Sequence, residues 1–425
     1  MLIKLFDYFS VKKNIYTSRD ALDILRLNLL RKQILHAYRN IPYFKKSFDD
    51  ANLNPDNFHS IEDLLLYPII TKDVIRANYS QMLNHNTLSR GWFKSHTSGS
   101  TGQPMWTHYD MKSWLRKKYL VKARARIECG VKSNEKIATF EAISQHSVPK
   151  GNALFQIFKS HYKVYSIFTP YKETIQKLIS FSPQALYGPS SYFLQLAQHI
   201  EKNGTQVPSI KRIFTSSEYL QETVRNYIKE IFSADVYDIY GSTEFKEVAW
   251  ECETHEGYHI NEDEVIVEVV NNGKVQPLGT IGNIVITDLR NKVMPLIRYQ
   301  MYDKGILIDK NCNCGRTFSL MKPCAGRSSE YIILPNDEIL SPYLFTTNIE
   351  KINGLLQYQI IQFTKEKILV NAVTNSEDFD RIVDTIKGIL SNITNHLMEV
   401  EVQLKTKLDV EENGKFKVVK NLILK

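Results

Sequence analysis

The sequence predicts an α/β protein with a large N-terminal domain, made of a parallel βαβ sheet and a β-rich part, and a small α+β C-terminal domain. Three observations support this prediction. Strand-like and helix-like segments alternate from about residue 134 to 240, a helix-poor region with an alternating pattern follows residue 258, and mixed helices and strands fill the last hundred residues. Alternating strands and helices of this length imply crossover connections and hence a parallel sheet.

The N-terminal region is predicted to be helical. Leucines recur at helical spacing within residues 20–40, and Pro42 follows them. The stretch 61–81 is also helix-rich, and Pro68 interrupts it. These segments precede the alternating region and belong to the same large domain.

The alternating region supplies the strands and helices of the parallel sheet. The expected strands are 136–143, 185–188, 212–215 and 236–240, and the expected helices are 151–158, 190–202 and 220–232. Strands 264–270, 282–287 and 306–308 read as antiparallel or barrel-like, and the tail reads as helix 343–352, strands 358–363 and 367–373, helix 378–392 and strand 399–404. A chain of 425 residues exceeds one compact core, so we expect domains at 1–326 and 327–425.

Composition narrows the function classes. The net charge is +8, from 54 basic and 46 acidic residues, which suits a phosphate-rich ligand but is too dispersed to indicate nucleic-acid binding. The densest basic cluster, at residues 116–126, is interpreted as a solvated helix face in preference to a phosphate clamp. No apolar stretch approaches ~20 residues, so no membrane span is expected. The N-terminus does not read as a signal peptide, and five cysteines favour reduced thiols or a metal site in a cytoplasmic protein.

A loop rich in serine, threonine and glycine has the composition of a phosphate-binding loop. Its expected binding residues are Thr97, Ser98, Gly99, Ser100, Thr101 and Gly102. Glycines let backbone N–H groups approach phosphate oxygens, and hydroxyl groups add donors. The loop lacks the closing Gly-Lys-Ser/Thr of a Walker A loop, so a P-loop ATPase is not expected. A flexible surface loop would carry the same residues.

Two carboxylates lie at predicted strand ends. Glu244 closes the run Tyr-Gly-Ser-Thr-Glu directly after strand 236–240, at the end of a parallel strand where a magnesium ligand belongs. Asp303 closes the run that begins at Arg298, and a carboxylate leaving such a strand can accept hydrogen bonds from two ribose hydroxyls. A turn with a solvated glutamate and a hairpin aspartate are the alternatives.

The order of these motifs resembles a known superfamily. Thr-Ser-Gly-Ser-Thr-Gly-Gln-Pro, Tyr-Gly-Ser-Thr-Glu, Arg-Tyr-x-x-x-Asp, Gly-Arg and a late Gly-Lys follow one another as in acyl-CoA synthetases, luciferases and nonribosomal adenylation domains. The chain resembles most the phenylacetate–CoA ligase branch, including its capsule-associated CapK-type proteins. Two proline-bearing stretches, 40–44 and 67–72, are similar to the helical N-terminal region of that branch.

The resemblance implies a role for each matched residue and a mobile C-terminal domain. The loop would wrap the β- and γ-phosphates of ATP, and Arg327 would assist near the ribose and phosphates. Lys415 would reach the α-phosphate and the substrate carboxylate. The residues expected to contact the nucleotide and its magnesium ion are Tyr240, Gly241, Ser242, Thr243, Glu244 and Asp303. The acid pocket would form around 141–147, 187–193 and 215–218.

The implied activity is ATP-dependent conversion of a carboxylic acid to an acyl-AMP, with release of pyrophosphate and transfer of the acyl group to coenzyme A. Two alternatives stay open. The acyl group could pass to an amine or hydroxyl in capsule or exopolysaccharide synthesis, or the chain could be a catalytically silent nucleotide-binding scaffold. A homodimer is also open.

Cysteines and histidines form a second pattern. Cys252 and His259 precede Cys312 and Cys314 by about fifty residues, and this set can supply a tetrahedral Cys₃His zinc site. His255 competes with His259 as the fourth ligand. The resemblance adds that related proteins carry a similar structural zinc. Buried reduced cysteines beside loop histidines are the alternative.

Overall fold

The chain forms two compact units, each assembled from two stretches of sequence. The computed structural model describes residues 11–86, 92–96, 105–141, 161–327, 332–340, 345, 348–349, 352–374, 378–411 and 416–423, the side chains of 96, 325–327 and 339 excepted. Unit 1 comprises Met1–Gly130 and Ile239–Pro323, and unit 2 comprises Val131–Asp238 and Cys324–Lys425. The domain boundary predicted at residue 327 stays a prediction.

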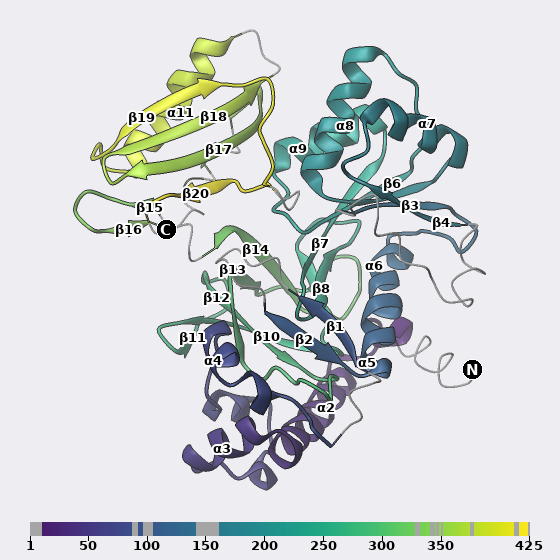
Figure 1. Ribbon diagram of the computed structural model, residues 1–425, viewed down its shortest axis with the longest axis vertical. Helices are drawn as coiled ribbons and strands as arrows, with labels where there is room; N and C mark the ends of the chain where they lie inside the picture. The colour runs from purple at the N-terminus through teal and green to yellow at the C-terminus, as the bar shows by residue number, and fades with distance from the viewer. Residues whose placement is uncertain are drawn as a thin grey trace. The chain divides into compact units, whose positions relative to one another are not determined.

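Helices dominate the N-terminal part of unit 1 (Figure 1). They are α2 (Arg19–Asn40), α3 (Pro42–Asp50), α4 (Lys72–Ala77), α5 (Met111–Leu115) and α6 (Lys122–Glu128), with η1 (Pro55–Asn57), η2 (Glu62–Leu66), η3 (Tyr79–Met82) and the π-helical η5 (Arg116–Val121). Helix α2 confirms the leucine pattern, and its N-cap is Ser18, whose side chain accepts from the N–H of Ala21. The predicted helix-rich stretch 61–81 consists of the short helices η2, α4 and η3.

Unit 1 contains an antiparallel sheet and a two-stranded ribbon. Its strands are β1 (Phe93–His96), β2 (Trp106–Tyr109), β7 (Asp235–Ser242), β8 (Lys246–Glu251), β9 (Tyr258–Ile260), β10 (Val265–Asn271), β11 (Lys274–Val275), β12 (Gly282–Asp288), β13 (Tyr299–Ile308) and β14 (Leu320–Arg327). β7 begins in unit 2, and β14 ends there. The order is β11-β10-β12-β13-β14-β9-β8-β7, and β1 pairs with β2. The antiparallel pairing of β10 with β12 confirms the prediction for this region.

Unit 2 contains the parallel sheet that the alternating pattern predicted. Its elements up to residue 234 are β3 (Ile137–Glu141), β4 (Tyr162–Ser166), α7 (Tyr171–Phe181), β5 (Ala185–Gly188), α8 (Ser190–Asn203), β6 (Arg212–Ser216) and α9 (Glu222–Phe232). Strands β3, β4, β5 and β6 pair in parallel. The helix predicted at 151–158 lies outside the described residues.

The C-terminal part of unit 2 is a small α+β layer (Figure 1). Its elements are β15 (Ile332–Ile333), β16 (Ile339–Leu340), β17 (Leu355–Thr364), β18 (Lys367–Thr374), α11 (Phe379–Ile393), β19 (Glu399–Leu404) and β20 (Val419–Asn421). The sheet order is β19-β18-β17-β20, and α11 packs against it. These elements confirm the predicted strands and the helix 378–392, while most of the helix predicted at 343–352 lies outside the described residues. The predicted α/β class is confirmed.

The basic cluster at 116–126 differs from its prediction, because three of its side chains are buried ion-pair partners. Arg116 contacts Glu264 at 2.5 Å, Lys117 contacts Asp288 at 2.9 Å, and Arg124 contacts Asp263 at 2.7 Å. A charge leaves water only when a partner compensates it, and these acidic partners come from distant parts of the sequence. Within the described part of the chain, no helix combines the length and apolarity that crossing a membrane requires.

Candidate active site

The run Tyr-Gly-Ser-Thr-Glu forms the end of β7 and its turn into β8, in unit 1. Ser242 pairs with Lys246, so Thr243, Glu244 and Phe245 form the tip of a hairpin. A Cβ atom on Gly241 would lie 2.4 Å from the carbonyl oxygen of Lys246, so only glycine fits here. The sequence predicted a glycine turn after this strand, and the structure shows that glycine lets two backbones meet just before the turn.

Two buried tyrosines hold Glu244 in place. The hydroxyl of Tyr299 donates to Oε1 of Glu244 over 3.3 Å, and the hydroxyl of Tyr109 donates to the carbonyl oxygens of Thr243 and Glu244. Burial, followed by the charge of Glu244, raises the pKa of Tyr299, so this hydroxyl stays a donor. Glu244 is only 7% exposed although it lies at a hairpin tip, so its position on this turn is fixed by the surrounding side chains.

Asp303 lies next to Tyr240. The hydroxyl of Tyr240 donates to Oδ2 of Asp303 over 3.0 Å. Asp303 lies in the middle of β13 and does not leave the strand as the sequence predicted. The pairing of β13 with β12 is irregular between Gln300 and Lys304, and the contacts of Tyr299 and Asp303 bring β13 against both ends of the Tyr-Gly-Ser-Thr-Glu run.

The arginine of the Arg-Tyr-x-x-x-Asp motif is a structural residue. Arg298 is buried, has a left-handed backbone (φ 49°) and forms a two-pronged ion pair with Glu268. Its other terminal nitrogen donates to the carbonyl oxygens of Leu65 and Tyr67, immediately before Pro68. Arg298 therefore ties the helical N-terminal segment to the start of the strand that carries Asp303.

Lys246 also belongs to this site, although the sequence did not single it out. Its ammonium group donates to Oγ of Ser95 over 2.7 Å and to the carbonyl oxygen of Thr243 over 2.8 Å. Burial lowers the pKa of Lys246 to about 8. Neither apolar periodicity nor a motif marks this lysine, because its partners come from β1 and from the hairpin tip.

In unit 2, Glu218 joins two of the three stretches expected to form the acid pocket. Its carboxylate accepts from both hydroxyls of Ser190 and Ser191, from the N–H of Ser191, and from the N–H of Phe416 over 2.7 Å. Burial raises the pKa of Glu218, while these donors favour its charged form. Phe416 directly follows Lys415, so Glu218 anchors the chain next to the predicted catalytic lysine. Residues 142–147, the rest of the expected pocket, lie outside the described residues.

The four predicted zinc ligands come together in unit 1. One ligand atom from each of Cys252, His259, Cys312 and Cys314 lies within 4.8 Å of all the others. The sulfur atoms of Cys252 and Cys312 are 3.6 Å apart, and Sγ of Cys314 is 3.2 Å from Nε2 of His259. A tetrahedral site with Zn–S bonds of about 2.3 Å and Zn–N bonds of about 2.0 Å requires similar distances between its ligand atoms.

Local structure explains why His259, and not His255, completes the set. His259 is fully buried on β9, and its Nδ1 lies 3.0 Å from the carbonyl oxygen of Phe318, which leaves Nε2 facing the sulfurs. His255 lies in the preceding turn, with Nδ1 3.6 Å from Glu251. Gly315 adopts φ +78°, which closes the Cys-x-Cys-Gly turn. The donor set fits zinc, and metal binding itself stays a prediction.

Several predicted site residues lie outside what the structure describes. They are Thr97, Ser98, Gly99, Ser100, Thr101 and Gly102 of the loop, Lys415, and the side chain of Arg327, whose backbone ends β14. The ribbon that flanks the loop is described, and His96 pairs with Trp106 across it. The structure thus brings together the residues of the hairpin and β13. The roles of the loop, of Lys415 and of Arg327 stay predictions.

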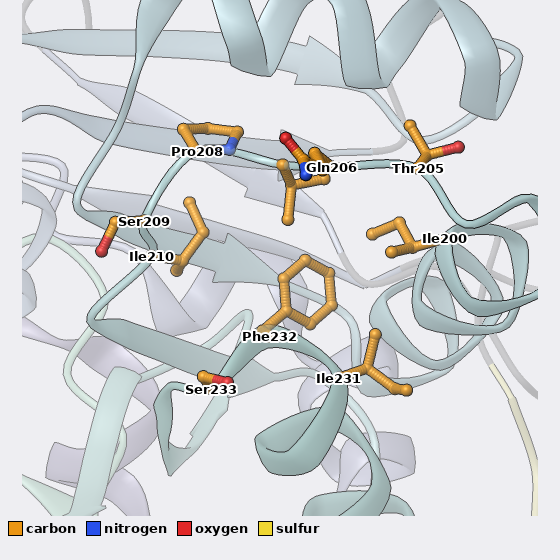
Figure 2. A pocket seen from close by; sticks show the side chains of 10 residues that line it. Ile200, Thr205, Gln206, Pro208, Ser209, Ile210, Ile231, Phe232 and Ser233 are labelled. Carbon is orange, nitrogen blue, oxygen red and sulfur yellow. The ribbon is translucent and has the colours of Figure 1, made fainter.

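A hollow of about 380 Å³ in unit 2 contains none of the predicted site residues (Figure 2). It lies where α8 and α9 end, and Ile200, Ile210 and Phe232 form much of its apolar wall (Figure 2). No carboxylate or cation lines it. Its polar side chains, Thr205, Gln206, Ser209 and Ser233, are uncharged and offer no cation to the phosphates of a nucleotide.

Comparison with known proteins identifies relatives along most of the chain. The phenylacetate–coenzyme A ligase of Pseudomonas putida is 28% identical over 354 residues, covering 79% of this chain and 76% of the relative. The enzyme of the same name from Thermus thermophilus is 26% identical over 342 residues, covering 74% and 72%. A crystal structure of 2-hydroxyisobutyryl-CoA ligase in its postadenylation state superposes with a TM-score of 0.77 at 18% identity, covering 95% and 91%. No family model matches the chain.

Proposed function

We propose that this chain, which resembles the phenylacetate–CoA ligase branch of the adenylate-forming ligases, activates a carboxylic acid with ATP and passes the acyl group to coenzyme A. The enzyme class is an AMP-producing ligase of the acid–CoA type. The resemblance seen in the motifs is confirmed, and the CapK-type subdivision stays a prediction.

The observation that carries the proposal is the meeting of the hairpin and β13. Tyr240 reaches Asp303, and Tyr299 reaches Glu244, so an aromatic ring and two carboxylates from distant segments lie together. In this proposal the adenine ring stacks on Tyr240, and Asp303 accepts hydrogen bonds from the ribose hydroxyls. Glu244 would coordinate a magnesium ion through its carboxylate oxygen. A magnesium ion at Glu244 would neutralise charge on the phosphates.

In the first step, a carboxylate oxygen of the substrate attacks the α-phosphorus of ATP, and the bond from that phosphorus to the bridging oxygen breaks as pyrophosphate leaves. Negative charge grows on the non-bridging oxygens and on the leaving group. We assign Lys415 to the α-phosphate and the substrate carboxylate, and Arg327 to the ribose and phosphates. The Ser/Gly loop, Thr97–Gly102, supplies backbone and hydroxyl donors to the outer phosphates.

In the second step, the thiol of coenzyme A attacks the acyl carbon, and AMP leaves. We assign the hydrogen bond from the N–H of Phe416 to Glu218 a part in the switch between the two steps, because withdrawal of the segment that carries Lys415 would strain or break it. An amine or hydroxyl acceptor, as in capsule synthesis, would use the same first step. Those two acceptors, a homodimer and the cytoplasmic location stay predictions.

The cysteine–histidine cluster completes the proposal as a structural zinc site. All four ligand positions come from the protein, so a bound zinc ion would have no open position for substrate. The ion would lock the end of β8, strand β9 and the Cys-x-Cys-Gly turn to one another.

Carboxylate-dependent ATP–pyrophosphate exchange tests the proposal. Wild type and Lys415→Ala are compared over a broad panel of aromatic, aliphatic and hydroxy acids. We expect wild type to catalyse exchange with one class of acid, and we expect Lys415→Ala to lose that exchange. Replacing coenzyme A by amines or sugars in a product assay then identifies the acceptor. ATP binding without exchange for any acid would favour the silent scaffold.

A further inference from the structure

Lys246 occupies a position in the hairpin that glycine usually takes. In three-residue hairpin loops, the residue after the tip adopts a left-handed conformation, and Lys246 has φ 66°. A residue with a Cβ atom is strained there, and strain of this kind collects at functional sites. Arg298 has the same backbone conformation in a structural role, so the contacts of the Lys246 side chain decide its function.

The ammonium group of Lys246 is held between aromatic rings and two oxygen acceptors. It lies 5.2 Å from the ring centre of Tyr109 and 5.1 Å from that of Trp114. Its hydrogen-bond acceptors are Oγ of Ser95 and the carbonyl oxygen of Thr243. An ammonium has three N–H donors, and within the described residues no third acceptor is found for this one.

The charged groups around Lys246 determine which kind of ligand its third N–H group would attract. Glu244 faces Lys246 from the hairpin tip, and Lys117, Lys118 and Lys122 face it from the helical segment η5–α6. Lys117 is already paired with Asp288. With Asp288 counted against Lys117 and Glu244 against one further lysine, the positive charges among these groups still outnumber the negative ones, which favours an anion.

The position of Ser95 indicates which anion. Ser95 lies on β1, which runs directly into the Ser/Gly loop, and residues 97–104 contain no lysine or arginine. Such a loop offers neutral donors only, whereas the leaving pyrophosphate carries most of the charge of the reaction. Lys246 is a cation beside the loop's entry strand, two residues from the proposed magnesium ligand.

We infer that Lys246 binds the β- and γ-phosphates of ATP, and hence the leaving pyrophosphate, and so supplies the charge that the Ser/Gly loop lacks. This inference rests on the proposed function. It assigns Lys246 a task separate from that of Lys415, which acts at the α-phosphate. A lysine that merely pins Ser95 to the hairpin would affect all nucleotides alike.

Nucleotide affinity separates these two roles. The full-length protein with magnesium is titrated calorimetrically with ATP and with AMP, which lacks the outer phosphates. Lys246→Met removes the charge at nearly constant shape, Lys246→Arg keeps the charge, and Ser95→Ala removes the pinning contact but keeps the lysine. Thermal unfolding of each variant accompanies the titrations.

We expect Lys246→Met to weaken ATP binding about tenfold or more and AMP binding less than about threefold, because a charge-assisted hydrogen bond contributes an effect of that size. Lys246→Arg should bind ATP with an affinity within about threefold of wild type, and Ser95→Ala should change the ATP affinity by less than about threefold.

Equal losses of affinity for ATP and AMP in Lys246→Met would overturn the inference. So would a loss of ATP affinity in Ser95→Ala that matches the loss in Lys246→Met. If wild type binds both nucleotides and Lys246→Met does not differ from it, the inference alone fails. If wild type binds neither, the proposed function fails as well.

Discussion

The cysteine–histidine cluster and the nucleotide corner, formed by Tyr240, Glu244, Tyr299 and Asp303, lie at opposite ends of strand β8 and are built differently. In the cluster, every ligand atom faces the other three. In the corner, the polar groups meet in two separate pairs. Four ligand atoms around one point suit a metal ion that stays bound. Polar groups that meet only in pairs can still form contacts with a substrate. The difference fits the roles that we propose, a structural zinc ion at one end of β8 and the reactants at the other.

Removing a cluster ligand should have the largest effect on stability. Cys312→Ser should abolish zinc binding and lower the free energy of unfolding by on the order of 4 kcal/mol, because a structural metal is part of the folding free energy. Zinc content by atomic emission and urea unfolding measure this. Cys129→Ser is the matched control, since its thiol lies outside the cluster and contacts the carbonyl oxygen of Glu251. Wild type without zinc, or Cys312→Ser with full zinc, would contradict the comparison.

Changing the corner should affect activity while leaving zinc bound. Glu244→Gln should reduce ATP–pyrophosphate exchange by about 100-fold or more, because it removes the carboxylate that we assign to magnesium. Zinc content should equal that of wild type. Tyr299→Phe removes only the hydroxyl that donates to Glu244 and should cost less than about tenfold. Near-normal exchange in Glu244→Gln would place the chemistry elsewhere.

Between the two ends, β8 carries Glu247, a buried carboxylate whose oxygens have no hydrogen-bond partner among the described residues. Burial raises its pKa to about 7, against the lowering effect of Arg126, Lys122 and Arg124. From its unfolded pKa of about 4.5 up to about pH 7, the folded chain keeps a proton that the unfolded chain releases. The free energy of unfolding therefore falls as pH rises through this window.

Glu247→Gln should remove that fall. At pH 8 the variant should be more stable than wild type by on the order of 2 kcal/mol, and below about pH 4.5 the two should be similar. Urea unfolding at pH 4.5, 6 and 8 measures the difference. A variant less stable than wild type at pH 8 would show that the charged carboxylate is stabilised in the fold.

The sequence predicted those features of the fold and of the site that residues close together in the chain determine. Alternating periodicity predicted the parallel strands around Ala185–Gly188 and the helix Ser190–Asn203, and the spacing of Cys312 and Cys314 predicted a tight turn with two sulfurs on it. It did not decide between His255 and His259, because only the pairing of β9 with β8 and β14 shows which ring is buried.

Side chains whose partners lie far along the chain were not predicted. Lys246 depends on Ser95, 151 residues away, and Glu218 depends on Phe416, 198 residues away. A signal did exist for Glu218, because a carboxylate just after strand β6 stands at the sheet edge where Glu244 and Asp303 were sought. The basic run at 116–126 carried no sign of burial, since its compensating acids lie near 263 and 288.

We propose above all that this chain uses ATP to join an acid to coenzyme A by way of an acyl-AMP. The most direct test incubates the zinc-loaded protein with ATP, magnesium, coenzyme A and the acid panel, and quantifies AMP, ADP and acyl-CoA by mass spectrometry. We expect equal amounts of AMP and acyl-CoA for at least one acid, with no ADP. Formation of ADP, or no acid-dependent loss of ATP with any acid and any acceptor, would contradict it.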